Sequence, residues 1–121
     1  MEPHCIFCQI VAKKIAAHIV YEDANFLAFL DIHPQAPGHT QIIPKQHYRW
    51  VWNVPEIGKY FEITRAMAQA QQKAFGVEAI WSRIMGDEVA HAHIWLFPNP
   101  QLATGDKNDF AGNATKIRAA L

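Results

Sequence analysis

One long helical segment, set between short β-prone runs, constrains the fold of this chain more than any other feature. Apolar residues recur with helical spacing up to Phe75. Asn53 is a residue type that caps helices, Glu56 follows it by three positions, and Pro55 is tolerated in a first turn. Gly76 is well placed to end the helix. The sequence therefore predicts a helix that starts near Asn53 and ends at about Phe75.

Short β-prone runs lie on both sides of that helix. Turn residues separate the first two runs, as in a hairpin, and a proline ends the third. The predicted strands cover residues 20–22, 26–31, 40–43, 78–85 and 91–97. A short C-terminal helix is predicted over residues 113–121. Strands gathered around one long helix are typical of the α+β class with a mostly antiparallel sheet.

Composition and charge exclude several classes of protein. The chain has 121 residues, half of them hydrophobic, which is enough for a single domain spanning residues 1–121. Eleven basic residues balance eleven acidic ones, so neither duplex nucleic-acid binding nor a basic membrane patch is expected. The polar N-terminus lacks the pattern of a signal peptide, and no apolar run approaches the roughly 20 residues that span a bilayer. We therefore expect a cytoplasmic protein whose partners are neither nucleic acids nor membranes.

Two histidines lie close together in the last predicted strand. Because side chains alternate between the faces of a strand, His91, His93 and Trp95 share one face, and the other face is apolar. Buried imidazoles need polar partners, so the pair is either functional or a set of satisfied structural histidines. The preceding loop, Gly86–Val89, favours function, since inward backbone N–H groups beside a neutral imidazole form a workable phosphate site. Imidazole is a competent nucleophile toward phosphorus, and His93 is the candidate.

At these residues the sequence resembles the histidine-triad (HIT) superfamily of nucleotide hydrolases and transferases. The family signature is His-x-His-x-His followed by two apolar residues, and residues 91–97 read His-Ala-His-Ile-Trp-Leu-Phe. Other blocks that resemble the family are residues 5–10, 29–34, 37–39 and 43–47. The resemblance covers roughly residues 4–98 and leaves 99–121 as a C-terminal extension. It implies a HIT-like fold of about five antiparallel strands with a long helix, usually in a homodimer.

The resemblance also implies roles for individual residues. Asp31 would hydrogen-bond the ribose hydroxyls of a purine nucleotide, and Ile32 would border the base. His93 would attack the α-phosphate, with His39 behind it to support its orientation, and water would then release a nucleoside monophosphate. Taken without the family, these residues have simpler interpretations. Asp31 could cap a turn before Pro34, Ile32 could belong to the core, and His39 could be a turn histidine.

Cys5 and Cys8 are separated by two residues, the usual spacing for one metal ion. In a cytoplasmic protein such a pair is not expected to form a structural disulfide. Bacterial proteins that this chain resembles complete a zinc site with histidines at the positions of His47 and His91. The resemblance therefore implies a closed, structural zinc site with two cysteine and two histidine ligands. The alternatives are two reduced buried cysteines, a redox pair, or competing histidine ligands at His4 and His33.

Two features depart from the family pattern. Trp95, which would line the substrate site, stands where the third histidine is expected, and an indole N–H donates one hydrogen bond but cannot accept one. Asp87 and Glu88 occupy loop positions where many relatives have neutral donors for phosphate oxygens. Each carboxylate would repel a phosphate by roughly 1 kcal/mol at ~4 Å in water. They would therefore point outward, bind a cation or bind a substrate amine.

Three functions fit these observations. The first is an enzyme that cleaves at the α-phosphate of a nucleoside phosphoramidate or a dinucleotide polyphosphate through a nucleotidyl group on His93. The second is a zinc-stabilised module that binds or senses a nucleotide with little activity. The third is an interaction domain in which the histidines serve zinc and the core. The balanced charge and the family positions filled by Asp31, His39 and His93 argue against the third.

Overall fold

The computed structural model describes residues 2–121 and is built on one antiparallel sheet. The strands are ordered β1-β2-β3-β5-β4 across the sheet, and each neighbouring pair is antiparallel. In chain order the elements are α1 (Ile6–Val11), β1 (Ile19–Glu22), β2 (Phe26–Leu30), β3 (Thr40–Pro44), the 3-10 helix η1 (Val51–Asn53), α2 (Ile57–Phe75), β4 (Ile80–Arg83), β5 (Ile94–Pro98) and α3 (Phe110–Ala120). This arrangement confirms the α+β class with a five-stranded antiparallel sheet and one long helix.

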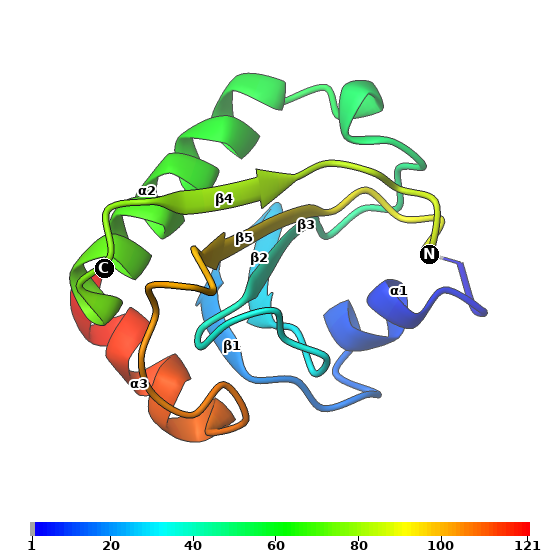
Figure 1. The fold of residues 1–121 in the computed structure, drawn as a ribbon. Coiled ribbons are helices and arrows are strands. Elements are labelled where there is room, and N and C mark those ends of the chain that lie inside the picture. The colour runs from blue at the N-terminus through cyan, green and yellow to red at the C-terminus, as the bar shows by residue number, and fades with distance from the viewer. Residues whose placement is uncertain (1) are drawn as a thin grey trace.

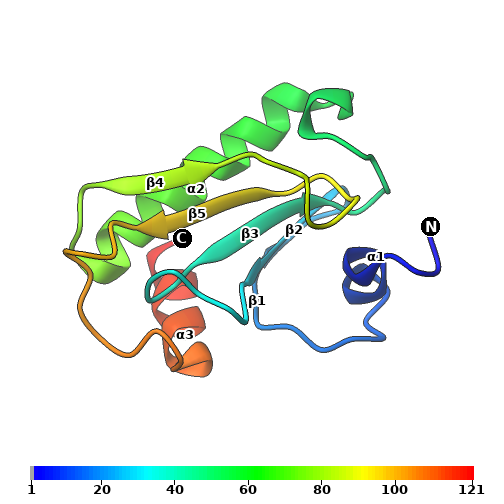
Figure 2. The same ribbon diagram turned by 45° about the vertical axis from the view of Figure 1, so that its right-hand side comes forward.

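The helices are divided between the two faces of the sheet. Figures 1 and 2 show α2 and α3 together on one side, and the short α1 on the other side near the N-terminus. Side chains that alternate along the strands fill both interfaces. The larger core, on the α2 side, includes Ile42, Ile94 and Ile117, and the smaller core joins Phe7 of α1 to Phe29. Because α1 is only six residues long, it covers only part of its face of the sheet.

Gln71 of α2 joins the long helix to two strands that carry candidate site residues. Its buried side-chain amide donates to the carbonyl oxygens of Gly38 and Leu96, each at 3.0 Å, and lies 3.3 Å from Thr40 Oγ1. A buried amide bonded to both strands has little freedom to move without losing these partners. It therefore helps to fix the position of β3 relative to β5.

The long helix starts later than its sequence predicts. α2 begins at Ile57 with Glu56 as its N-cap residue, and no side chain caps it. Asn53 belongs instead to η1, where its backbone N–H donates to the Trp50 carbonyl oxygen at 3.0 Å. The residue before Pro55 is extended, with φ of −71° and ψ of 119°, as the steric demand of proline requires. At the other end, Gly76 adopts a left-handed conformation and ends the helix as predicted.

Three other boundaries also differ from the predicted ones. β5 begins at Ile94, so His91 and His93 precede the strand, although they keep its alternation of faces. The reason is that Ala92 N–H donates to the Tyr48 carbonyl oxygen at 2.7 Å instead of joining the sheet ladder. β4 is shorter than predicted, and α3 starts three residues early because Asp109 caps it by accepting from Gly112 N–H.

Replacing Gly38 with alanine is expected to destabilise the fold. Gly38 has φ of 78°, in the left-handed region, and a Cβ atom there would collide with the ring of Phe75. Backbone strain and the displaced ring together should lower the free energy of unfolding by about 2–4 kcal/mol. Gly58→Ala is the matched control, since Gly58 is helical with open space around it, and it should be neutral or stabilise by up to about 1 kcal/mol. Equal midpoints of urea unfolding for the two variants would contradict this expectation.

Candidate active site and metal centre

His93 lies just before β5, and its hydrogen bond determines which ring nitrogen carries the proton. Nδ1 lies 2.7 Å from the carbonyl oxygen of His91. A carbonyl oxygen only accepts hydrogen bonds, so Nδ1 donates and Nε2 keeps its lone pair. His93 is 4% exposed and packs edge-on against Phe7, with ring centroids 5.3 Å apart. The ring is therefore held as the tautomer whose Nε2 can act as a nucleophile.

The loop before β5 begins beside this histidine. Gly86 is buried with φ of 92°, and Nη1 of Arg49 donates to its carbonyl oxygen at 2.7 Å. The next two residues, Asp87 and Glu88, are exposed. Glu88 and Val89 line an open pocket with residues of the N-terminus. The exposure of Asp87 and Glu88 is compatible with all three predicted roles of the loop carboxylates.

Asp31 follows β2, and its carboxylate is already bonded within the chain. Oδ1 accepts from the backbone N–H of His33 at 2.8 Å, and Oδ2 accepts from Nε2 of Gln41 at 3.1 Å. Asp31 thus caps the turn after β2, while 10% of its side chain is exposed to solvent. The neighbouring Ile32 is 65% exposed, so its interpretation as a core residue is wrong.

His39 is buried beside Asp31. Its Nδ1 accepts from the backbone N–H of Gln35 at 3.0 Å, so Nε2 carries the proton, and Nε2 lies 3.6 Å from Asp31 Oδ2. Burial lowers the pKa of His39 to about 4, against the opposing effect of Asp31. The resemblance implies that His39 stands behind His93. In the structure the Nε2 edge of the ring faces Asp31, and the support of His93 by His39 stays a prediction.

Trp95 is the partner of Gln41 across the β3–β5 pair, and its side chain is half-buried. Its ring lies edge-on to His39, with centroids 4.9 Å apart. The indole Nε1 is buried and has no hydrogen-bond partner among residues 2–121. The side chain at the third triad position therefore packs against a histidine of the sheet and makes no polar contact near His93.

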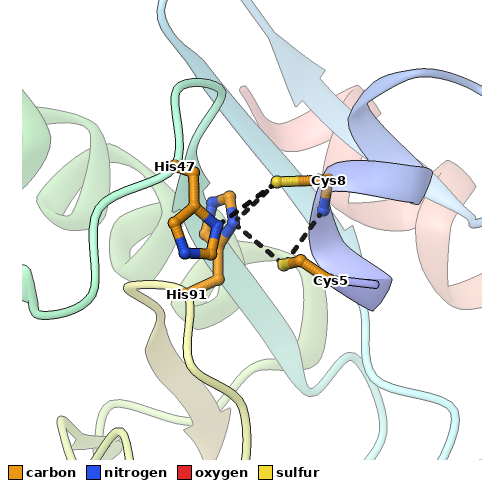
Figure 3. Close-up of side chains that lie close together, drawn as sticks. All are labelled: Cys5, Cys8, His47 and His91. Atoms are coloured by element: carbon orange, nitrogen blue, oxygen red, sulfur yellow. Dashed lines mark hydrogen bonds between the residues drawn. The ribbon is translucent and has the colours of Figure 1, made fainter. Parts of the chain in front are cut away.

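Four side chains from distant parts of the chain form a second cluster. Cys5, Cys8, His47 and His91 each offer one ligand atom, and these atoms all lie within 4.8 Å of one another. Figure 3 shows the two histidine rings facing the two thiols across a small gap. The cluster brings together the four residues that the resemblance implies as zinc ligands. The competing candidates, His4 and His33, are not part of it and are exposed.

The tautomer of His91 suits metal binding. Its Nε2 donates to the carbonyl oxygen of Pro44 at 2.8 Å, so Nδ1 has the lone pair. This Nδ1 lies 3.3 Å from Cys5 Sγ and 3.5 Å from Cys8 Sγ. Burial lowers the pKa of His91 to about 4, which keeps the ring neutral as a ligand must be.

The distances in this cluster also match a tetrahedral zinc site. Zn–S bonds of about 2.3 Å and Zn–N bonds of about 2.0–2.1 Å place the sulfur and nitrogen atoms about 3.5–3.6 Å apart. Three of the four S···N distances among Cys5, Cys8, His47 and His91 are 3.3, 3.3 and 3.5 Å. Two thiols and two imidazoles fill all four positions of a tetrahedron, so such a site would have no open position for catalysis.

Comparison with known proteins identifies the family. The HIT domain matches residues 12–102 of the chain. The chain belongs to the HIT family. Among its HIT relatives, the adenosine 5'-monophosphoramidase of Saccharomyces cerevisiae is 32% identical over 108 residues, which cover 87% of this chain and 68% of the relative.

Solved structures of HIT proteins share this fold. A HIT-like protein involved in cell-cycle regulation from Bartonella henselae has a TM-score of 0.88 and 32% identity, covering 99% of this chain and 98% of that one. A zinc-bound histidine triad family protein from Mycobacterium smegmatis has a TM-score of 0.78 and 29% identity, covering 97% of this chain and 92% of that one. The HIT fold implied by the resemblance is therefore confirmed.

Three contacts in this HIT site were not anticipated from the sequence. Phe7, the carbonyl oxygen of Pro44 and the side chain of Gln41 each contact a candidate residue. A backbone carbonyl and a phenylalanine in an apolar helix carry no distinguishing signal in a sequence. Gln41 does carry one, because it is a polar side chain within the β-prone run of residues 40–43.

Proposed function

We propose that this HIT-family protein is a nucleotide hydrolase or transferase that cleaves at the α-phosphate of a purine nucleoside phosphoramidate or a dinucleotide polyphosphate. The observation that carries the proposal is the hydrogen bond from His93 Nδ1 to the His91 carbonyl oxygen, which leaves Nε2 with a lone pair for attack on phosphorus. The phosphoramidase named among the relatives supports the same class of substrate.

In the proposed reaction, Nε2 of His93 attacks the α-phosphorus. A phosphorus–nitrogen bond forms, and the bond from phosphorus to the leaving group breaks, so that the leaving group takes the electron pair. The ring becomes cationic as it attacks, and the His91 carbonyl oxygen stabilises that charge through Nδ1–H. Water then attacks the same phosphorus and the phosphorus–nitrogen bond breaks, which releases a nucleoside monophosphate and neutral His93. The proton that the water gives up to solvent balances the proton that the leaving group takes from solvent. Asp31 binds the sugar, Ile32 borders the base, and Gly86–Val89 borders the phosphate in this proposal.

We also propose that Cys5, Cys8, His47 and His91 bind one structural zinc ion. The four ligand atoms and the tautomer of His91 support this assignment, as does the zinc-bound HIT structure from M. smegmatis. When bound, zinc would link α1 to the segment that precedes β5, and it would supply structural stability alone. The chemistry remains with His93, which the ligand set does not include.

Incubation of the purified protein with adenosine phosphoramidate, and separately with a diadenosine polyphosphate, tests the proposed function. AMP should be released from at least one of them, and acid-labile adenylyl groups should be found on the protein after rapid quenching at neutral pH. Titration calorimetry with AMP measures binding independently of turnover. A protein that neither releases AMP nor binds it would overturn the proposal.

A second candidate function is a nucleotide-binding or sensing module with little activity. Trp95 Nε1 has no partner among residues 2–121, and Asp87 and Glu88 stand where neutral donors would assist a leaving group. Both observations weaken the leaving-group end of the site and leave the sugar end intact. In the same experiment, this function would give AMP binding without AMP release.

Location and oligomeric state stay predictions. Across residues 2–121 the structure has no helix that is both long and apolar enough to cross a membrane. Cell fractionation would measure the expected cytoplasmic location, and sedimentation equilibrium would measure the homodimer that the resemblance implies.

A further inference from the structure

Three side chains meet at the end of β2. Asp31 accepts a hydrogen bond from Gln41 and lies close to His39. We propose that His39 and Gln41 are positioning residues that hold the Asp31 carboxylate for a sugar hydroxyl, and that His39 acts through Asp31 instead of through His93. This inference rests on the proposed function, because the sugar is that of the nucleotide.

The loop between β2 and β3 closes on His39 and thereby orients its ring. Asp31 N–H donates to the His39 carbonyl oxygen at 2.9 Å, and His39 N–H donates to the Ala36 carbonyl oxygen at 3.2 Å. Gln35 N–H donates to Nδ1 of His39 at 3.0 Å. Three backbone bonds thus determine both the position of the ring and its tautomer. Among the described residues 2–121, the remaining ring donor, Nε2–H, has no hydrogen-bond partner. It lies 3.6 Å from Asp31 Oδ2, so that carboxylate oxygen is the acceptor near it.

Gln41 approaches the same carboxylate oxygen from β3. Its Nε2 donates to Asp31 Oδ2 at 3.1 Å, and the residue is 8% exposed. The opposite orientation of the amide would bring its oxygen against the carboxylate, so only the donating orientation is favourable. Trp95 lies opposite Gln41 in the β3–β5 pair and packs on His39, so it borders both residues. Trp95, at the third triad position, thus supports the two residues that hold Asp31.

The free capacity of Asp31 selects the kind of ligand group. Oδ1 accepts one hydrogen bond, from His33 N–H, and a carboxylate oxygen accepts about two. Among residues 2–121, no lysine or arginine forms an ion pair with Asp31. The Asp31 side chain is 10% exposed, and the next residue, Ile32, is 65% exposed. Oδ2 accepts from Gln41 and lies within reach of His39, so the open acceptor position of the fixed carboxylate is on Oδ1, where it matches an O–H donor of a ribose.

The test compares His39→Leu with His39→Gln on two ligands, AMP and 2',3'-dideoxy-AMP. A glutamine amide nitrogen reaches the position of Nε2 and can donate to Asp31, whereas leucine cannot. His39→Leu should weaken AMP binding by roughly tenfold, the loss expected for one charge-assisted hydrogen bond, and should change kcat by less than about threefold. His39→Gln should restore most of the affinity. Binding of the dideoxy ligand, measured by calorimetry, should be equal in all three proteins.

Gln41→Leu provides a second variant if His39→Leu fails to fold, and the same selective loss of AMP affinity is expected. Gln101→Leu, at an exposed position outside the site, is the matched control. Equal weakening of both ligands would reduce His39 to a structural residue, and a fall in kcat with unchanged AMP affinity would assign it to His93. Either result would overturn the inference while nucleotide binding stands. No AMP binding by the unaltered protein would instead remove the proposed function itself.

Discussion

Replacing His93 with asparagine is expected to lower the rate of AMP release from the proposed substrates on the order of 10³-fold or more, as loss of a covalent nucleophile does in other enzymes. An asparagine amide can still donate to the His91 carbonyl oxygen, as Nδ1 of His93 does at 2.7 Å. It has no equivalent of the Nε2 lone pair. The variant should therefore fold and bind AMP like the unaltered protein, and it should carry no adenylyl group after quenching.

The matched control for this variant is His18→Asn. His18 is exposed and stacks on Phe110 of α3. This helix lies on the opposite face of the sheet from α1 (Figure 1). His18 undergoes the same chemical change without touching the site, so the turnover of this variant should match that of the unaltered protein. Turnover that is equal in His93→Asn and His18→Asn would show that His93 is not the nucleophile.

Replacing Cys8 with serine is expected to remove bound zinc and to destabilise the protein. Cys8 is buried, and its Sγ lies 3.3 Å from His47 Nδ1 and 3.5 Å from His91 Nδ1. A metal ion that binds only the folded state contributes to folding, and at a thousandfold excess over its dissociation constant it contributes about 4.1 kcal/mol. A loss of that size should lower the thermal midpoint by roughly 10–20 °C in a domain of this length.

Elemental analysis and thermal unfolding check this expectation together. The unaltered protein should contain one zinc ion per chain, and a chelator should lower its midpoint toward that of Cys8→Ser. The matched controls are His4→Ala and His33→Ala, the competing ligands of the sequence, which should keep both zinc and midpoint. Zinc retained by Cys8→Ser, or lost from either control, would refute this ligand set.

Loss of zinc should also affect His93, the proposed nucleophile. The His91 ring is held at both nitrogens, by the Pro44 carbonyl oxygen and by the two thiols, and the backbone carbonyl of the same residue accepts from His93. A single residue therefore connects the cluster to the tautomer of the nucleophile. Impaired turnover in Cys8→Ser would follow from this connection, so activity of that variant reports on both sites.

Local signals in the sequence predicted the elements that depend on local interactions. The hairpin of β1 and β2 follows from two β-prone runs around a turn, and the end of α2 follows from the conformational freedom of Gly76. The start of α2 was predicted too early, because the capping pattern at Asn53 competed with a 3-10 turn stabilised by its neighbours. Residues before β5 were assigned to the strand because alternation of faces persists where the ladder is absent.

The strand alternation of His91, His93 and Trp95, the pairing of Cys5 with Cys8, and the α+β class were accessible from the sequence by itself, since each depends on spacing along the chain. The direction in which His39 points was not, and neither was the proton position on His91 or His93. These depend on backbone N–H and carbonyl groups far along the chain, which every residue type carries alike. Only the tertiary structure brings those groups to the rings, and the roles proposed for the three histidines depend on them.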